Sequence, residues 1–155
     1  MMNTRGLSLV ELVTVLGIIS VGSLVAVPAV LKWKTGADFR GTAARLVSSL
    51  QYARSYSYTN CELVVIDFHE KGYEIFVDNG EGNGHAGDWV RNGNERLLVA
   101  HQSPASVSID TNFSSERFRF KGYGRNQPGS IFLNQSNLLN TRIVVNVLGR
   151  IRVEY

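Results

Sequence analysis

The sequence has only one cysteine, Cys61, so its 155 residues cannot form an intramolecular disulfide. Stability must therefore come from packing, and a lone cysteine is expected to be a small buried apolar residue. Hydrophobic residues make up 44% of the chain and charged residues 19%, which excludes a disordered composition. The length suits one domain with a modest core.

Signatures of catalysis are missing as well. His69, His85 and His101 lack the spacing of metal ligands, and there is no nucleophile elbow or P-loop. The glycines of Gly80-x-Gly82-x-Gly84 are not a nucleotide fingerprint, because no helix signal follows them. The sequence therefore predicts neither an enzyme nor a bound cofactor, and a membrane-anchored enzyme is the weakest alternative.

Charge is almost absent from residues 6–31, where Glu11 is the only ionisable side chain. The apolar run LSLVELVTVLGIISVGSLVAVPAVL covers residues 7–31. At about 1.5 Å per residue its helix is longer than the hydrocarbon core of roughly 30 Å, so it can span a membrane. Arg5 precedes the run and Lys32 and Lys34 follow it, so flanking charge does not settle its orientation.

Three interpretations of this segment compete. A secretory signal has an apolar core of about 7–15 residues and a small-residue cleavage site. Val27-Pro28-Ala29 offers such a site, but the run is too long and Glu11 interrupts its start. A plain membrane anchor leaves Glu11 unexplained, because an ionisable group within a membrane segment is costly and usually functional. The third interpretation, a processed assembly helix, depends on the residues around Gly6.

The segment Arg5-Gly6-Leu7-Ser8-Leu9-Val10-Glu11 resembles the processing site of type IV pilins and pseudopilins. This resemblance implies that a prepilin peptidase cleaves after Gly6 and methylates the new N-terminus at Leu7, where the family usually has phenylalanine. It also implies an assembly role for Glu11, the fifth residue of the mature chain. Pro28 falls where many pilins carry a helix-kinking proline.

The chemistry of a filament suits this interpretation. Cleavage would create an α-amino group at Leu7, which is mostly cationic at neutral pH. Between staggered helices, a neighbour's Glu11 could meet that amine in a low-dielectric core, where an unpaired charge is costly. The pair would set the register of the helices. Gly17, Gly22 and Pro28 weaken the helix locally, which would allow bending or local melting during assembly.

The rest of the chain predicts an α+β fold, in which a long N-terminal helix packs by its C-terminal half on antiparallel sheets. An amphipathic stripe extends the helix to about residue 58. Its members are Phe39, Ala43, Leu46, Leu50 and Ala53. The predicted strands cover residues 63–68, 73–77, 96–99, 107–109, 117–121, 130–133, 142–147 and 150–153. The expected parts are a leader (1–6), a membrane and filament-core segment (7–31) and a globular domain (32–155).

The order of these pieces resembles the GspH/FimT branch of the pilin family, which holds minor type IV pilins and minor pseudopilins of type II secretion. The matching blocks are Phe76–Asp78 with a Gly/Asn loop and Glu95–Leu98, then Phe120–Arg125, then Ile143–Arg152. The resemblance implies three partners: other pilins or pseudopilins in a filament, the prepilin peptidase and an inner-membrane assembly platform. It also implies a single-pass bacterial inner-membrane protein with its globular domain in the periplasm.

Acidic residues are almost absent from the last part of the chain. From Arg117 to Tyr155 there are seven cations and one acid, Glu154, so this region has a net charge of +6. Residues 117–121 alternate strictly, which predicts three cations on one face of a strand and two phenylalanines on the other. Arg150 and Arg152 alternate in the same way and would lie about 6.6 Å apart, within reach of neighbouring phosphates.

The segment Gly149-Arg150-Ile151-Arg152 is similar to the DNA-contacting GRxR motif of FimT-type minor pilins. The resemblance implies that Gly149, Arg150 and Arg152 contact the phosphate backbone of double-stranded DNA without reading bases. Charge alone adds three weaker candidates, Lys121, Arg125 and Arg142. The alternatives are an outward strand face whose arginines cover apolar surface, and a GspH-type pseudopilin with no DNA role. The basic region favours the pilin.

A glycine-rich loop covers residues 78–88. Asp78, Glu81 and Asp88 could offer oxygen ligands to calcium, but glycines stand where an EF-hand needs ligands. A mobile, solvated loop without a metal is therefore the preferred interpretation.

Overall fold

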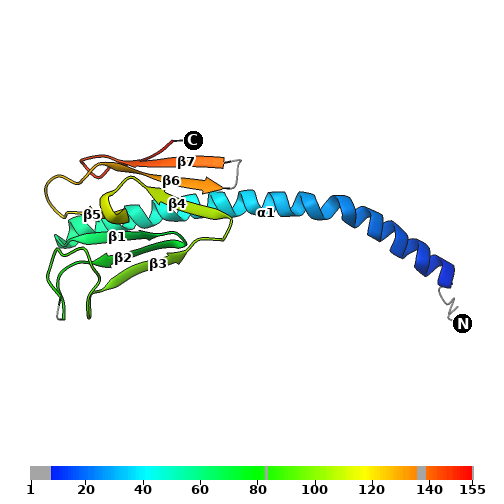
Figure 1. The fold of residues 1–155 in the computed structure, drawn as a ribbon, viewed down its shortest axis with the longest axis horizontal. Coiled ribbons are helices and arrows are strands. Elements are labelled where there is room, and N and C mark those ends of the chain that lie inside the picture. Colours follow the sequence, from blue (N-terminus) through cyan, green and yellow to red (C-terminus); the bar gives the residue numbers. More distant parts are fainter. Residues whose placement is uncertain (1–7, 83, 136–138, 155) are drawn as a thin grey trace, which may run out of the picture. The chain divides into compact units, whose positions relative to one another are not determined.

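The computed structural model describes residues 8–82, 84–135 and 139–154. The chain divides into two compact units, Met1–Ala37 and Asp38–Tyr155. The helix α1, Leu9–Asn60, contributes to both of them (Figure 1). Gly6 and Leu7, the predicted processing site, lie outside the described residues.

The first unit consists of the apolar half of α1. Its described residues are exposed up to Leu31, and the helix is long and apolar enough to cross a membrane. Ser8 is the N-cap, and its backbone N–H donates to the Glu11 carboxylate over 3.2 Å, as in a capping box. The hydroxyls of Ser20 and Ser23 donate to carbonyls one turn earlier. The helix continues through Pro28, so this proline does not end it.

The second half of α1 carries the predicted stripe. Phe39, Leu46, Leu50 and Ala53 are buried, and Ala43 is partly buried. The helix ends at Asn60, close to the predicted end.

The prediction of a buried Cys61 is wrong, because this residue is exposed. It follows the last helical residue with a φ of 56°, the left-handed conformation that commonly ends a helix. Its side chain therefore leaves the buried stripe.

The first sheet has the strand order β3-β2-β1-β5, with neighbours antiparallel. The predicted hairpin is present, with Val64 opposite Val77 and His69 opposite Gly72. The bounds of the strands are Val64–His69 (β1), Gly72–Val77 (β2), Leu97–Gln102 (β3) and Arg117–Phe120 (β5).

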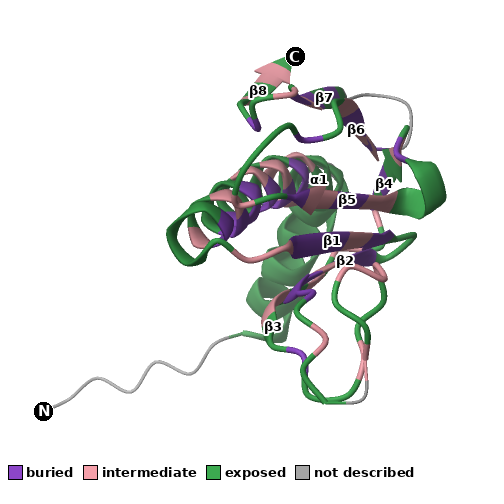
Figure 2. Cartoon of the chain, turned by 90° about the vertical axis from the view of Figure 1, so that its left-hand side faces the viewer, coloured by how far each residue is buried: buried purple, intermediate pink, exposed green. Residues whose placement is uncertain are grey.

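The second sheet has the order β4-β6-β7-β8 and is also antiparallel. A short 3₁₀ helix, η1 (Ser114–Glu116), connects β4 to β5 of the other sheet. Figure 2 shows α1 lying between the two sheets within this unit. The bounds are Val107–Thr111 (β4), Gly129–Gln135 (β6), Leu139–Val145 (β7) and Ile151–Glu154 (β8).

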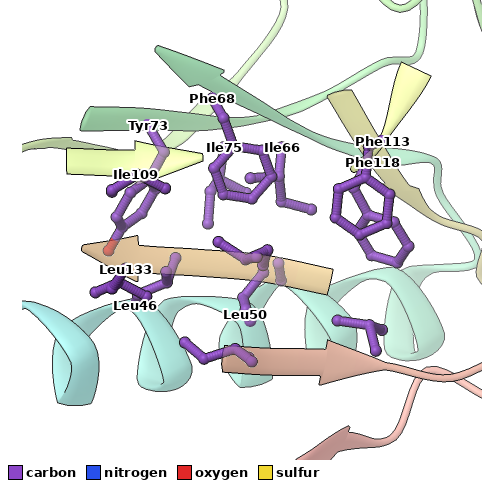
Figure 3. Packing of buried hydrophobic residues seen from close by; sticks show 14 of the residues in the cluster. Leu46, Leu50, Ile66, Phe68, Tyr73, Ile75, Ile109, Phe113, Phe118 and Leu133 are labelled. Atoms are coloured by element: carbon purple, nitrogen blue, oxygen red, sulfur yellow. The ribbon is translucent and has the colours of Figure 1, made fainter. Parts of the chain in front are cut away.

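One hydrophobic core joins α1 to both sheets (Figure 3). Leu50 from the helix, Ile66 from β1 and Leu133 from β6 are fully buried in it. Fully burying one such side chain contributes about 1.5–3 kcal/mol. All buried members of this cluster lie between Phe39 and Val145. The unit Asp38–Tyr155 thus has its own core, so we expect it to fold alone. The predicted α+β architecture is confirmed.

Candidate nucleic-acid interface

The arginines of β5 face away from the core, as the alternation predicts, while Phe118 and Phe120 are fully buried. Arg117 and Arg119, however, each already contact an acidic side chain. The Nε of Arg117 donates to Oδ2 of Asp67, the residue opposite it on β1, over 3.0 Å. Arg119 lies 3.6 Å from the buried carboxylate of Asp78. Two of the seven cations therefore compensate acids that lie in, or directly after, strands of the first sheet.

Arg142 is also engaged. It lies on the outer face of β7, opposite Glu154 of β8, and the two side chains are 3.7 Å apart. Its Nε donates to the hydroxyl of Ser130 on β6 over 3.0 Å. Arg142 is thus the weakest of the predicted DNA contacts.

Four cations of this region remain exposed and form no ion pair with any acid in the described parts of the chain. They are Lys121, Arg125, Arg150 and Arg152. Lys121 and Arg125 follow β5, which ends at Phe120, so Lys121 is not part of the alternating strand. Arg152 lies on the outer face of β8, opposite Val144, while Ile151 and Val153 are half-buried. The predicted alternation of β8 is correct at these residues.

Residues 121–126 and 146–150 are tied together, and we call these two segments the loop pair. The N–H of Asn126 donates to the carbonyl of Val147 over 2.9 Å. The Asn126 side-chain oxygen accepts the N–H of Lys121 over 2.9 Å. In the second segment, Oδ1 of Asn146 accepts the N–H of Arg150 over 2.8 Å. Lys121, Arg125 and Arg150 therefore belong to two segments that a hydrogen bond joins.

Gly149 closes the second segment of the loop pair. Its φ is 71°, a conformation that favours glycine, and its N–H donates to the carbonyl of Asn146 over 2.8 Å. A Cβ at this position would lie 3.0 Å from Nδ2 of Asn126 and 3.4 Å from the Phe120 ring. Gly149 thus lets the second segment of the loop pair pack closely against Asn126 and Phe120.

We expect Gly149→Ala to destabilise the unit Asp38–Tyr155 by about 2–3 kcal/mol, since left-handed strain adds to crowding. Chemical denaturation measures this change. Gly124→Ala is the matched control, because Gly124 also has a positive φ, 89°, but no atom near its Cβ position. It should cost about 1 kcal/mol. Equal costs for the two variants would contradict the packing role of Gly149.

Many described residues of the 78–88 loop are exposed to solvent, but two buried carboxylates accept hydrogen bonds from its backbone. Oδ1 of Asp78 accepts the N–H of Gly87 over 2.6 Å, and Oδ2 accepts the N–H of Trp89 over 3.2 Å. Glu95, also buried, accepts the N–H groups of Gly80 and Asn92 over 2.9 and 2.8 Å. Protein donors thus occupy the Asp78 oxygens considered for calcium. Within the described residues, no three metal-ligating side chains gather at one place.

Sequence reasoning missed Glu95 and the structural role of Asp78. For Asp78 the available signal was its place directly after the buried strand β2, where an unpaired carboxylate would be costly.

The three histidines lie in different elements: His69 ends β1, His85 is in the 78–88 loop and His101 is in β3. His101 packs against Tyr73, with ring centroids 5.4 Å apart. Burial, with the charge of Arg45, lowers the pKa of His101. Burial raises the pKa of Tyr73, whose hydroxyl donates to Ser49 over 3.0 Å. Tyr73 and Ser49 are both buried, so this contact belongs to the core.

Comparison with known proteins adds family and fold. The sequence profile of the family described as Type II transport protein GspH matches residues 42–149. Two crystal structures of the type IV minor pilin FimU from Pseudomonas aeruginosa are similar. One has a TM-score of 0.60 at 18% identity and covers 77% of this chain and 90% of FimU. The other has a TM-score of 0.56 at 19% identity and covers 75% of this chain and 92% of FimU. No curated protein matches the sequence.

The two FimU structures show that the fold is that of a minor pilin, as the sequence predicted. The matched profile covers most of the chain, including both segments of the loop pair up to Gly149. The chain therefore belongs to the GspH family.

Proposed function

We propose that this GspH-family protein is a minor pilin of a type IV pilus. In this proposal it binds the phosphate backbone of double-stranded DNA during natural transformation. The observation that carries the proposal is the group of four exposed cations that form no ion pair within the described residues, three of them on the loop pair. Exposed arginines and lysines without acidic partners are free to replace the counterions of phosphates. The bidentate geometry of arginine suits this contact at Arg150 and Arg152.

The subunit would be held in the bacterial inner membrane by the apolar half of α1, with its globular unit in the periplasm. The prepilin peptidase would cleave after Gly6 and methylate Leu7, and the assembly platform would then add the subunit to a filament of other pilins. The exposed apolar surface of α1 up to Leu31 supports this assignment, because such a surface needs lipid or other helices to cover it.

The second candidate is a minor pseudopilin of a type II secretion system with no DNA role. The description of the matching family, Type II transport protein GspH, favours it. Only the minor pilin would contact DNA through Arg150 and Arg152, so a measurement of DNA binding distinguishes the two candidates.

We expect the full-length chain in an uncharged detergent to bind a short DNA duplex with strong salt dependence. Contacts from four cations predict a slope of about −3.6 in log K against log salt, and Arg150→Ala/Arg152→Ala should halve it to about −1.8. Fluorescence anisotropy over about 50–200 mM salt measures both values.

Arg40→Ala/Lys71→Ala is the matched control, since it removes the same charge from exposed positions outside the loop pair and β8 that form no ion pair within the described residues. It should leave the slope close to that of the unaltered chain. Unchanged affinity of the Arg150→Ala/Arg152→Ala variant at low salt would overturn the DNA role and leave the pseudopilin.

A further inference from the structure

The loop pair carries two large apolar side chains in water. Tyr123, in the first segment, is 72% exposed, and Leu148, in the second, is 62% exposed. They are the most exposed large hydrophobic side chains of the unit Asp38–Tyr155 among its described residues. A contact with phosphates requires only charge and hydrogen-bond donors, so phosphate binding does not explain them.

The Tyr123 loop is anchored at both ends. On one side, a Cβ at Gly122 would lie 2.5 Å from the carbonyl of Ser57, so the backbone presses against the end of α1. On the other side, Asn126 binds both Lys121 and Val147 through hydrogen bonds. Anchoring reduces the conformational entropy that the ring would lose when a ligand binds it.

The order of residues in this loop is cation, aromatic, cation: Lys121, Tyr123 and Arg125. Proteins that bind single-stranded nucleic acid combine basic grooves with aromatic rings on which bases stack. Within a duplex, the faces of the bases are covered by their neighbours, whereas an unpaired base can offer its face to a ring. An exposed tyrosine between phosphate-binding cations thus fits unpaired DNA better than paired DNA.

We infer that the loop pair binds single-stranded DNA as well as the duplex backbone, with the Tyr123 ring stacking on an unpaired base. Lys121, Arg125 and Arg150 hold the phosphates on either side of that base. This inference rests on the proposed DNA function and adds to it a preference for DNA strands, or strand ends, whose bases are unpaired. It assigns Tyr123 as the residue that distinguishes unpaired from paired DNA.

The test compares one labelled oligonucleotide as a single strand and as a duplex, bound to the full-length chain in an uncharged detergent. Tyr123→Ala should weaken binding of the single strand by about 5- to 150-fold, the loss expected for one stacked base. Binding of the duplex should change by less than about twofold, because the cations remain. Tyr123→Phe keeps the ring and should bind the single strand almost as well as the unaltered chain.

Tyr52→Ala is the matched control. Tyr52 is also an exposed tyrosine of the same unit, but it lies on α1, so its removal should change neither affinity. If Tyr123→Ala leaves single-strand binding unchanged, or weakens both forms equally, the inference that Tyr123 distinguishes unpaired from paired DNA is overturned. If Arg150→Ala/Arg152→Ala leaves both forms bound as before, the proposed DNA function itself fails.

Discussion

Asp78→Ala is expected to destabilise the unit Asp38–Tyr155 by about 3–5 kcal/mol, the usual cost of removing one member of a buried ion pair. The Asp78 side chain is 0% exposed and that of Arg119 is 13% exposed. The substitution would leave the Arg119 guanidinium without its acid and the N–H groups of Gly87 and Trp89 without their acceptor. Denaturant unfolding of the isolated unit measures the loss.

A second measurement follows the loop itself. The Arg119 guanidinium lies 4.0 Å from the centroid of the Trp89 ring, a cation–π contact that Asp78 helps to hold. The unit Asp38–Tyr155 lacks Trp33, so Trp89 is its only tryptophan. We expect Asp78→Ala to shift the fluorescence emission of Trp89 toward that of solvent-exposed indole.

Asp88→Ala is the control for this prediction. Asp88 is in the same loop, but it is only half-buried and accepts hydrogen bonds from Val90 and Asn92 without a cation. Its removal should cost about 1 kcal/mol, as for ordinary hydrogen bonds. If Asp78→Ala cost no more than Asp88→Ala, the buried pair with Arg119 would not be what stabilises the loop.

The elements of this fold could be predicted because their signals are local. The stripe from Phe39 to Ala53 repeats with the helical period, and Phe118 and Phe120 repeat with the strand period. Both periodicities depend only on near neighbours along the chain. The hairpin of β1 and β2 was predictable for the same reason, since its turn lies between two apolar runs.

The pairing of the cations could not be predicted, because it depends on contacts between distant residues. Arg117 meets Asp67, fifty residues earlier in the chain, only because β5 pairs with β1. Arg119 meets Asp78 because β1 pairs with both β2 and β5, which brings the residue after β2 close to β5. Counting charges along the C-terminal region therefore overstated the free positive charge. Of the seven cations of this region, the structure leaves four without an ion pair among the described residues.

The candidate interface is likewise a product of tertiary structure. Lys121 and Arg150 are far apart in the sequence, and Asn126 and Gly149 join their loops. The alternation around Arg152 indicated only which side chains point outward. The exposed cysteine shows the same limit: whether Cys61 is buried depends on where α1 ends and on the φ of the next residue.

The structure also changes how the assembly hypothesis should be tested. In the single chain, Glu11 accepts the N–H of Ser8 at the start of α1. A loss of assembly in Glu11→Ala would therefore be ambiguous, because this change removes both a cap and a charge. Glutamine at the same position of a capping box still accepts that hydrogen bond. Glu11→Gln thus removes the charge and keeps the cap.

We expect Glu11→Gln to reduce incorporation into filaments roughly 100-fold, nearly as much as Glu11→Ala, if a neighbour's α-amino group at Leu7 needs a carboxylate in the filament core. The amount of subunit in sheared filaments, relative to the membrane fraction, measures incorporation. Membrane levels and cleavage after Gly6, read from the mass of the chain, should stay unchanged and serve as controls. Normal assembly of Glu11→Gln with failure of Glu11→Ala would mean that Glu11 acts as a helix cap, and the register of the filament would then have to come from apolar packing alone.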